Sequence, residues 1–160
     1  MQSGPETRNT QHAIRTAHYA LLVPILLVAL FLRTHRLVEV PAGVDYDEAG
    51  NLILASEIAR GESAPVFIRA YAGREAVFYW LAAGTMRLLG RSLLALRLTS
   101  ALCGVGAVLA SWFLAREMFH PGEGRPETPE STWVPPLTAA LMAVSYWQVH
   151  VNRYGFRVNA

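Results

Sequence analysis

The feature that most limits how this chain can fold is the charge-free segment between Arg97 and Arg116, which reads LTSALCGVGAVLASWFLA. A helix of about 20 predominantly apolar residues is long enough to cross the hydrocarbon core of a bilayer. Of the 160 residues, 52% are hydrophobic and only 16% are charged, whereas an ordinary soluble domain carries about 25% charged residues. The segment 93–118 is therefore predicted to span a membrane, and the chain to be an integral membrane protein.

Two further apolar blocks indicate membrane segments. The block YALLVPILLVALFL is followed by Arg33 and Arg36, whose long side chains can reach the interface, so we expect a span near 18–38. A cleaved signal peptide is the alternative for this block, but no small-x-small cleavage site follows it. The block WVPPLTAALMAVSYWQVHV carries aromatic residues near its ends and predicts a span near 133–151. The polar residues 1–16 are predicted to form a flexible tail.

The segment 41–91, between the first two spans, is predicted to lie outside the membrane. Within it, AGNLILASEIARG has the spacing of an amphipathic helix that ends at Gly61. The block at 76–89 is shorter than a span and contains Arg87, so we expect it to lie at the interface. About three crossings then place the acidic loop and the C-terminal NRYGFR on the same side of the membrane. The residues expected on the apolar side of the amphipathic helix are Leu52, Ile53, Ala55, Ile58 and Ala59.

Charge and residue content exclude several other classes of protein. The formal net charge is only +2, and the sequence contains no basic run, so we expect no nucleic-acid partner. The single cysteine, Cys103, lies inside an apolar block and cannot form an intrachain disulfide. The histidines show no metal-ligand spacing. The predicted fold class is all-α integral membrane, with about three transmembrane helices plus juxtamembrane and interfacial helices.

The side chains that could carry chemistry lie at the start of the external segment. The stretch VDYDEAGN contains Asp45, Asp47 and Glu48, and such carboxylates can act as a general base or bind a metal ion. The later YAGREAVFYW supplies Arg74, whose guanidinium can form paired hydrogen bonds to a phosphate. A carboxylate in a loop is more often simply solvated, so this pattern alone leaves catalysis open.

The order of these motifs resembles the start of the GT-C membrane glycosyltransferases. The chain runs through FLRTHRL, DEAGN, GREAVFYW, LRLTSALCGVGAVLASWFLAREMF and AVSYWQVHVNRYGFR. The resemblance is to the protein O-mannosyltransferase and aminoarabinose-transferase-like group, glycosyltransferase family 39 and its relatives, and it extends from about Leu26 onward. It implies that residues 17–160 form the N-terminal part of a GT-C module. We therefore expect the chain to be a fragment of a longer enzyme and to be inactive alone.

The resemblance implies that Asp47 and Glu48 are catalytic. Asp47 matches the residue that opens the family's Asp-Glu motif, so it would be the general base that takes the proton from an acceptor. Glu48 would support Asp47. The candidate ligands of a divalent metal ion, should one take part, are Glu48 and Glu75.

The resemblance also implies contacts with the substrate. Arg74 stands where relatives place a basic residue that binds the phosphate of a polyprenyl-phosphate-linked sugar donor. Glu75 and Tyr79 would contact this substrate, and Arg153 matches a recurrent arginine that completes the site from the same side. The chain departs from the family at Ala76, where relatives often have proline, and in GFRVN, where many have an aspartate.

The expected function is that of an inverting, hexosyl- or mannosyl-type transferase that acts on an acceptor hydroxyl or lipid. We expect a multi-pass protein of a bacterial cell membrane, surrounded by membrane lipid, with its site facing outward. The alternative is a small non-catalytic membrane protein, in which the acidic loop is solvated and the helices only bind partners or lipid. Apolar blocks that continue in frame beyond Ala160 would favour the enzyme.

Overall fold

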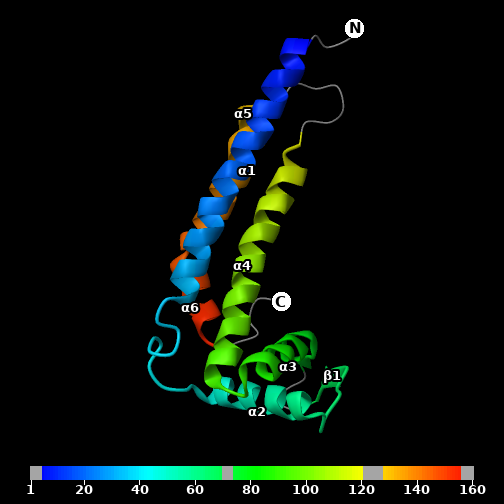
Figure 1. Cartoon of the computed structure of the whole chain (residues 1–160), viewed down its shortest axis with the longest axis vertical. Helices are drawn as coiled ribbons and strands as arrows, with labels where there is room; N and C mark the ends of the chain where they lie inside the picture. The colour runs from blue at the N-terminus through cyan, green and yellow to red at the C-terminus, as the bar shows by residue number, and fades with distance from the viewer. Residues whose placement is uncertain (1–4, 70–73, 121–127, 156–160) are drawn as a thin grey trace. The chain divides into compact units, whose positions relative to one another are not determined.

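A computed structural model of the chain describes residues 5–69, 74–120 and 128–155. Across these ranges the chain is mostly helical, with six helices and one antiparallel sheet of two short strands (Figure 1). The prediction of a predominantly α-helical chain is therefore confirmed.

The chain divides into two compact units, each with a cluster of buried apolar residues of its own. Unit 1 consists of residues 1–31 and 105–145, and unit 2 consists of residues 32–104 and 146–160. The residues predicted to carry chemistry all belong to unit 2.

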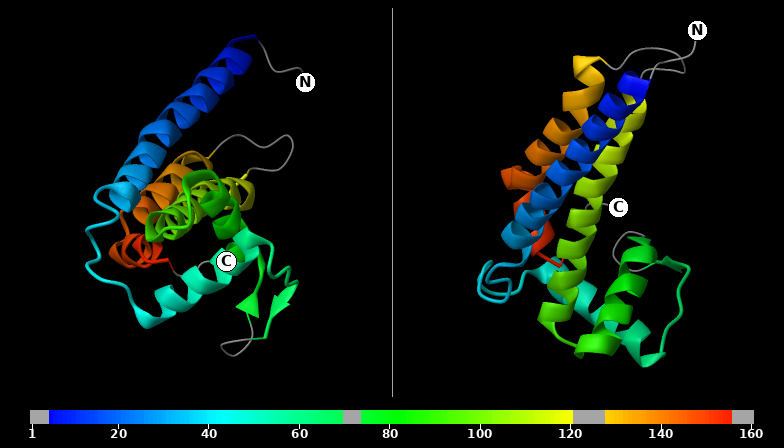
Figure 2. Two further views of the ribbon diagram at one scale, coloured as in Figure 1. Left: turned by 60° about the horizontal axis from the view of Figure 1, so that its bottom comes forward. Right: turned by 45° about the horizontal axis from the view of Figure 1, so that its top comes forward.

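Unit 1 is built from three helices that lie side by side (Figure 2). These are α1 (Pro5–Thr34) up to Phe31, α4 (Leu93–Met118) from Val105 onward, and α5 (Pro129–Val144). Several of the buried side chains are alanines, and small side chains allow helix backbones to approach one another closely. The buried cluster contains Leu22, Ala29, Val108, Trp112, Ala139 and Ala143.

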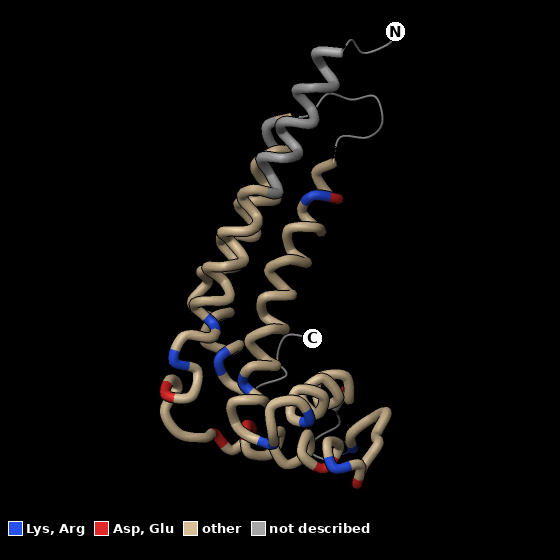
Figure 3. Tube along the Cα trace, viewed as in Figure 1, with Lys and Arg blue, Asp and Glu red and all other residues tan. Residues whose placement is uncertain are grey.

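Among the described residues, α4 is the one helix that is long and apolar enough to cross a membrane. Its bounds coincide with the predicted segment 93–118. Where the structure describes side chains in unit 1, charged residues occur only near the end of α4 (Figure 3). The remaining apolar helical stretches are shorter, and they are Ala20–Thr34, Val77–Leu89 and Ser131–Val144.

The helix ends differ from the prediction at two places. Residues 5–16, expected in a flexible tail, are helical, because α1 begins at Pro5 and proline suits the first position of a helix. The predicted span at 133–151 is not one continuous helix, because α5 ends before Ser145 and α6 (Tyr146–Arg153) begins after it. The ψ angle of Ser145 is 118°, which lies outside the helical range.

Unit 2 packs two short helices and a hairpin beside the first turns of α4. Helix α2 (Tyr46–Arg60) ends at Gly61, which adopts a left-handed conformation with φ 78°, as the sequence predicts. Strands β1 (Phe67–Ile68) and β2 (Arg74–Glu75) pair antiparallel and lead into α3 (Val77–Leu89). The fully buried members of the shared core are Ala55, Tyr79, Ala82, Ala95 and Leu96.

The buried face of α2 is more polar than the sequence pattern predicts. Its buried residues share one helical face, and Ile53, expected on the apolar side, is 56% exposed. The difference arises because Glu48 and Asn51 have polar partners inside unit 2, so their burial leaves no polar atom without a hydrogen bond. The buried residues of α2 are Glu48, Asn51, Ala55 and Ile58.

A second buried polar contact in unit 2 depends on a glycine. Arg33, expected to reach the interface, is instead fully buried, and its Nε donates a hydrogen bond to Asn152 Oδ1 at 3.1 Å. Gly104 lies against this pair. A Cβ atom added at Gly104 would be 2.9 Å from Arg33 Nε and would overlap the side chain of Asn152.

We expect Gly104→Ala to lower the free energy of unfolding by about 1–3 kcal/mol, because the buried Arg33–Asn152 contact would have to move to admit the methyl group. Thermal unfolding in a mild detergent would measure the change. Gly106→Ala is the matched control on the same helix, since no described atom lies within 4 Å of its added Cβ. Equal stability of the two variants would contradict the close packing at Gly104.

Candidate functional site

The exposed carboxylates of the acidic motif lie at the start of α2. Asp45 is the N-cap residue, and its side chain accepts a hydrogen bond from the backbone N–H of Asp47 at 3.3 Å. Asp47 is exposed and lies in the first turn, where the helix dipole favours a negative charge. The helix predicted from AGNLILASEIARG therefore begins three residues earlier, at Tyr46, and includes Asp47. The capping role of Asp45 was not predicted, although Asp followed by Glu three residues later is a known start signal.

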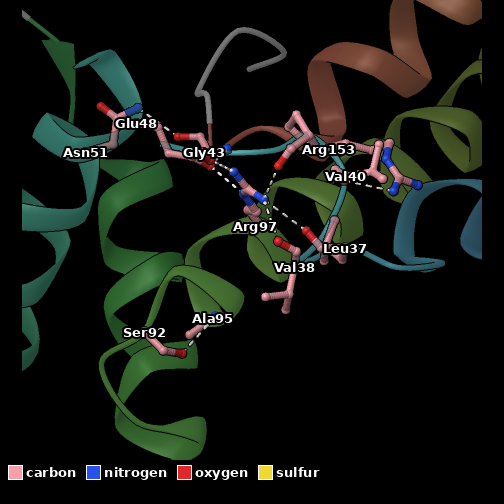
Figure 4. Close-up of polar contacts among 12 residues, drawn as sticks. Leu37, Val38, Val40, Gly43, Glu48, Asn51, Ser92, Ala95, Arg97 and Arg153 are labelled. Carbon is pink, nitrogen blue, oxygen red and sulfur yellow. Dashed lines mark hydrogen bonds and ion pairs between the residues drawn. The ribbon is translucent and has the colours of Figure 1, made fainter. Parts of the chain in front are cut away.

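Glu48 is held in a fully buried ion pair with Arg97, which lies near the start of α4 (Figure 4). Arg97 Nε donates to Glu48 Oε1 at 2.8 Å, and Arg97 Nη2 donates to Glu48 Oε2 at 2.9 Å. Two parallel hydrogen bonds of this kind fix both the distance and the orientation of the groups. Glu48, the residue that follows Asp47, is thereby anchored to α4.

The same guanidinium also shapes the loop that leads into α2. Arg97 Nη1 donates to the carbonyl oxygens of Leu37 at 3.1 Å and Pro41 at 3.0 Å. Arg97 Nη2 donates to the carbonyl oxygen of Gly43 at 2.7 Å (Figure 4). Because the planar guanidinium presents its donors in a fixed fork, one side chain sets the course of the loop up to the cap of α2.

The C-terminal segment is clamped against the start of α2 through Gly155. Its N–H donates to Glu48 Oε1 at 2.8 Å, and its carbonyl accepts from Asn51 Nδ2 at 2.7 Å. A Cβ atom at Gly155 would be 2.6 Å from Leu96 Cγ, so a larger residue would not fit. These contacts place Gly155 beside the start of α2 within unit 2, while the side of the membrane on which the two segments lie stays a prediction.

The side chain of Arg153 contacts backbone carbonyl oxygens rather than the carboxylates of the acidic motif. Its Nη1 donates to the carbonyl oxygen of Leu32 at 2.6 Å, and its Nη2 donates to those of His35 at 2.7 Å and Val40 at 2.8 Å. Burial, and secondarily the charge of Arg97, lower the pKa of Arg153, although a guanidinium stays protonated near neutral pH. Arg153 therefore holds the end of α1 and the following loop, which differs from the predicted role in substrate binding.

The structure also changes the role of Tyr79. This residue is fully buried, and its hydroxyl donates to Asn51 Oδ1 at 2.8 Å. A ring with no exposed surface has no face on which a sugar can stack, so Tyr79 supports α2 instead of contacting substrate. Glu75 has an exposed side chain at the end of β2, whereas the side chain of Arg74 lies outside the described residues.

The surroundings of the Glu48 carboxylate do not fit a metal site. Both of its carboxylate oxygens accept hydrogen bonds from the cationic Arg97, and one also accepts from Gly155. Within the described ranges, no group of three or more His, Cys, Asp or Glu side chains is arranged to hold a metal ion. The structure therefore gives Glu48 a structural role, as the partner of Arg97 and of Gly155.

Arg97 is the residue of this site that the sequence motifs do not single out. In the sequence, Arg97 directly precedes the charge-free segment. Its surroundings, LLALRLTSAL, nevertheless carry a signal, because an ionisable side chain within an apolar helix is expensive unless it is paired. This pattern predicts an acidic partner for Arg97 but does not identify the residue.

No protein-family model, curated protein or solved structure matches the chain. The sequence motifs and the geometry at the start of α2 therefore carry the functional assignment. The central feature of that geometry is an exposed Asp47, which follows a capped helix start and precedes the buried Glu48–Arg97 pair.

Proposed function

We propose that the chain is the N-terminal part of an inverting membrane glycosyltransferase that uses a polyprenyl-phosphate-linked sugar. The observation that carries the proposal is the exposed carboxylate of Asp47. This residue lies in the first turn of α2, between the capping residue Asp45 and Glu48, which is bound to Arg97. A general base must be held within hydrogen-bond distance of the proton that it removes. An anchored first turn meets that requirement better than a mobile loop would. The resemblance to GT-C enzymes supports the same assignment.

In the proposed reaction, Asp47 takes the proton of the acceptor hydroxyl. The hydroxyl oxygen attacks the anomeric carbon of the sugar from the face opposite the phosphate. The bond between the anomeric carbon and the phosphate oxygen breaks, and its electron pair leaves with the lipid phosphate. Attack from the opposite face inverts the configuration. In this scheme Arg74 binds the departing phosphate, and Glu75 contacts the sugar.

The proposal includes a multi-pass arrangement in a bacterial cell membrane, with α2, the β-hairpin and α3 outside the lipid core. The described charged side chains, except those near the end of α4, belong to unit 2 (Figure 3). Charged groups at the bilayer centre are costly, so this distribution favours a membrane position for unit 1. Helix α3 has only 13 residues, which favours a place at the interface over a crossing.

Cysteine labelling tests the position of α3. In a Cys103→Ser background, we expect Ser63→Cys and Arg91→Cys, on either side of α3, to react with a membrane-impermeant maleimide from the same face of the cell membrane. His120→Cys, beyond α4, should react from the other face because α4 crosses. Labelling of positions 63 and 91 from opposite faces would show that α3 crosses and would remove the arrangement of about three spans.

Sugar transfer by the complete gene product, in membranes supplied with a polyprenyl-phosphate-linked sugar, tests the reaction. Dependence of transfer on the Asp47 carboxylate would support the enzyme. Absence of transfer with a range of such donors, in protein that is present and folded, would favour the non-catalytic membrane protein instead.

A further inference from the structure

A pocket of about 250 Å³ lies in unit 2, where α2 and α3 end. Three of the residues that line it are arginines: Arg60 closes α2, Arg87 is in the last turn of α3, and Arg91 follows that helix. None of its described lining residues is acidic. The pocket shares no lining residue with the acidic turn at Asp47. The other lining residues are Ala59, Met86 and Gly90.

The three arginines are engaged to different degrees. Arg87 donates to the carbonyl oxygens of Ala59 at 3.0 Å and Ile58 at 3.1 Å, so it caps the C-terminus of α2. Arg60 Nη2 forms an exposed ion pair with Glu62 at 2.6 Å. Arg91 is exposed and makes no hydrogen bond or ion pair with the part of the chain that the structure describes. The described residues of unit 2 therefore account for Arg87 but make no polar contact that would hold Arg91 in place.

Exposed leucines flank these cations. Leu88 is 85% exposed and Leu89 is 56% exposed, and both lie between Arg87 and Arg91. Arginines that alternate with exposed apolar side chains at the end of a short helix are typical of segments that lie in the headgroup region of a membrane. There the guanidinium binds phosphate while the apolar side chain enters the acyl region.

We propose that this pocket binds the phosphate group of an anionic phospholipid. Arg87, held in place by the end of α2, forms the fixed wall, and Arg60 and Arg91 supply the donors that close on the phosphate oxygens. Leu88 and Leu89 contact the acyl chains. The site would set the depth of unit 2 at the membrane surface. It is independent of the proposed reaction, because it involves neither Asp47 nor its supporting residues.

Isothermal titration calorimetry on the full chain in an uncharged maltoside detergent tests the proposal. The ligand is dihexanoyl phosphatidylglycerol, compared with the phosphatidylcholine analogue and with glycerol phosphate. The variants are Arg91→Gln and Arg60→Gln, which leave the cap made by Arg87 intact. Arg69→Gln, an exposed arginine outside the pocket, is the matched control.

We expect each pocket variant to raise the Kd for phosphatidylglycerol about fivefold, and the double variant to raise it about 25-fold, with Arg69→Gln unchanged within about twofold. The phosphatidylcholine analogue and glycerol phosphate should bind at least about tenfold more weakly, since one lacks the net charge and the other lacks the acyl chains. An unchanged Kd in Arg91→Gln would overturn the site. Glycerol phosphate that binds as tightly as the lipid would identify a free-anion pocket and overturn the lipid assignment.

Discussion

Replacing Asp47 by Asn in the proposed full-length glycosyltransferase is expected to lower turnover by about 10²- to 10⁴-fold, with little change in donor binding. Asparagine is close in shape to aspartate but cannot accept the proton of the acceptor hydroxyl. The side chain is exposed in the first turn of α2 and belongs to neither buried core cluster. The substitution should therefore leave the fold intact. Single-turnover transfer and donor titration, measured on the same preparation, separate chemistry from binding.

Asp45→Asn is the matched control for that experiment. Asp45 carries the same charge two residues earlier, and its structural role is to cap α2. Asparagine caps helices about as well as aspartate, so this variant should keep both stability and turnover. Near-normal turnover in Asp47→Asn at unchanged protein level would remove Asp47 as the base and with it the proposed mechanism. An equal loss in both variants would indicate that the negative charge of the loop matters, rather than one base.

Local signals explain the parts of the fold that could be predicted. The bounds of α4 coincide with the prediction because a long charge-free segment has few alternatives. The end of α2 at Gly61 follows from helical spacing with a glycine stop, and the short α3 follows from the length of the apolar block at 76–89. The predicted segment AGNLILASEIARG begins two residues after Asp47, so a helix that starts one turn earlier includes it.

The supporting contacts of the site could not be predicted, because each joins distant parts of the sequence. Glu48 and Arg97 are 49 residues apart, and Glu48 and Gly155 are 107 apart. The sequence shows that each of these residues exists, but periodicity cannot pair them. Tyr79 shows the same limit, since an aromatic residue at the start of an apolar block can equally contact a sugar or, as here, donate a hydrogen bond that supports α2.

Replacing Glu48 by Gln is expected to lower the free energy of unfolding of the chain by about 3–5 kcal/mol, because it leaves the fully buried guanidinium of Arg97 without a counter-charge. One acceptor oxygen would also be lost, from a carboxylate that serves both Arg97 and the N–H of Gly155. Denaturant unfolding in a mild detergent would measure the change. In the proposed full-length glycosyltransferase, any loss of turnover should follow the loss of folded protein.

Glu57→Gln is the matched control, since Glu57 lies on the same helix and forms no ion pair with a described residue. Removal of such a charge should change stability by no more than about 0.5 kcal/mol. If Glu48→Gln were as stable as this control yet had lost turnover, Glu48 would act in the chemistry, as its place in the Asp-Glu motif first suggests. If it were less stable but retained turnover per folded molecule, its role would be to hold the helix start that positions Asp47. The buried pair with Arg97 favours the second outcome, because both carboxylate oxygens already accept hydrogen bonds from the guanidinium and the side chain is buried away from an acceptor hydroxyl.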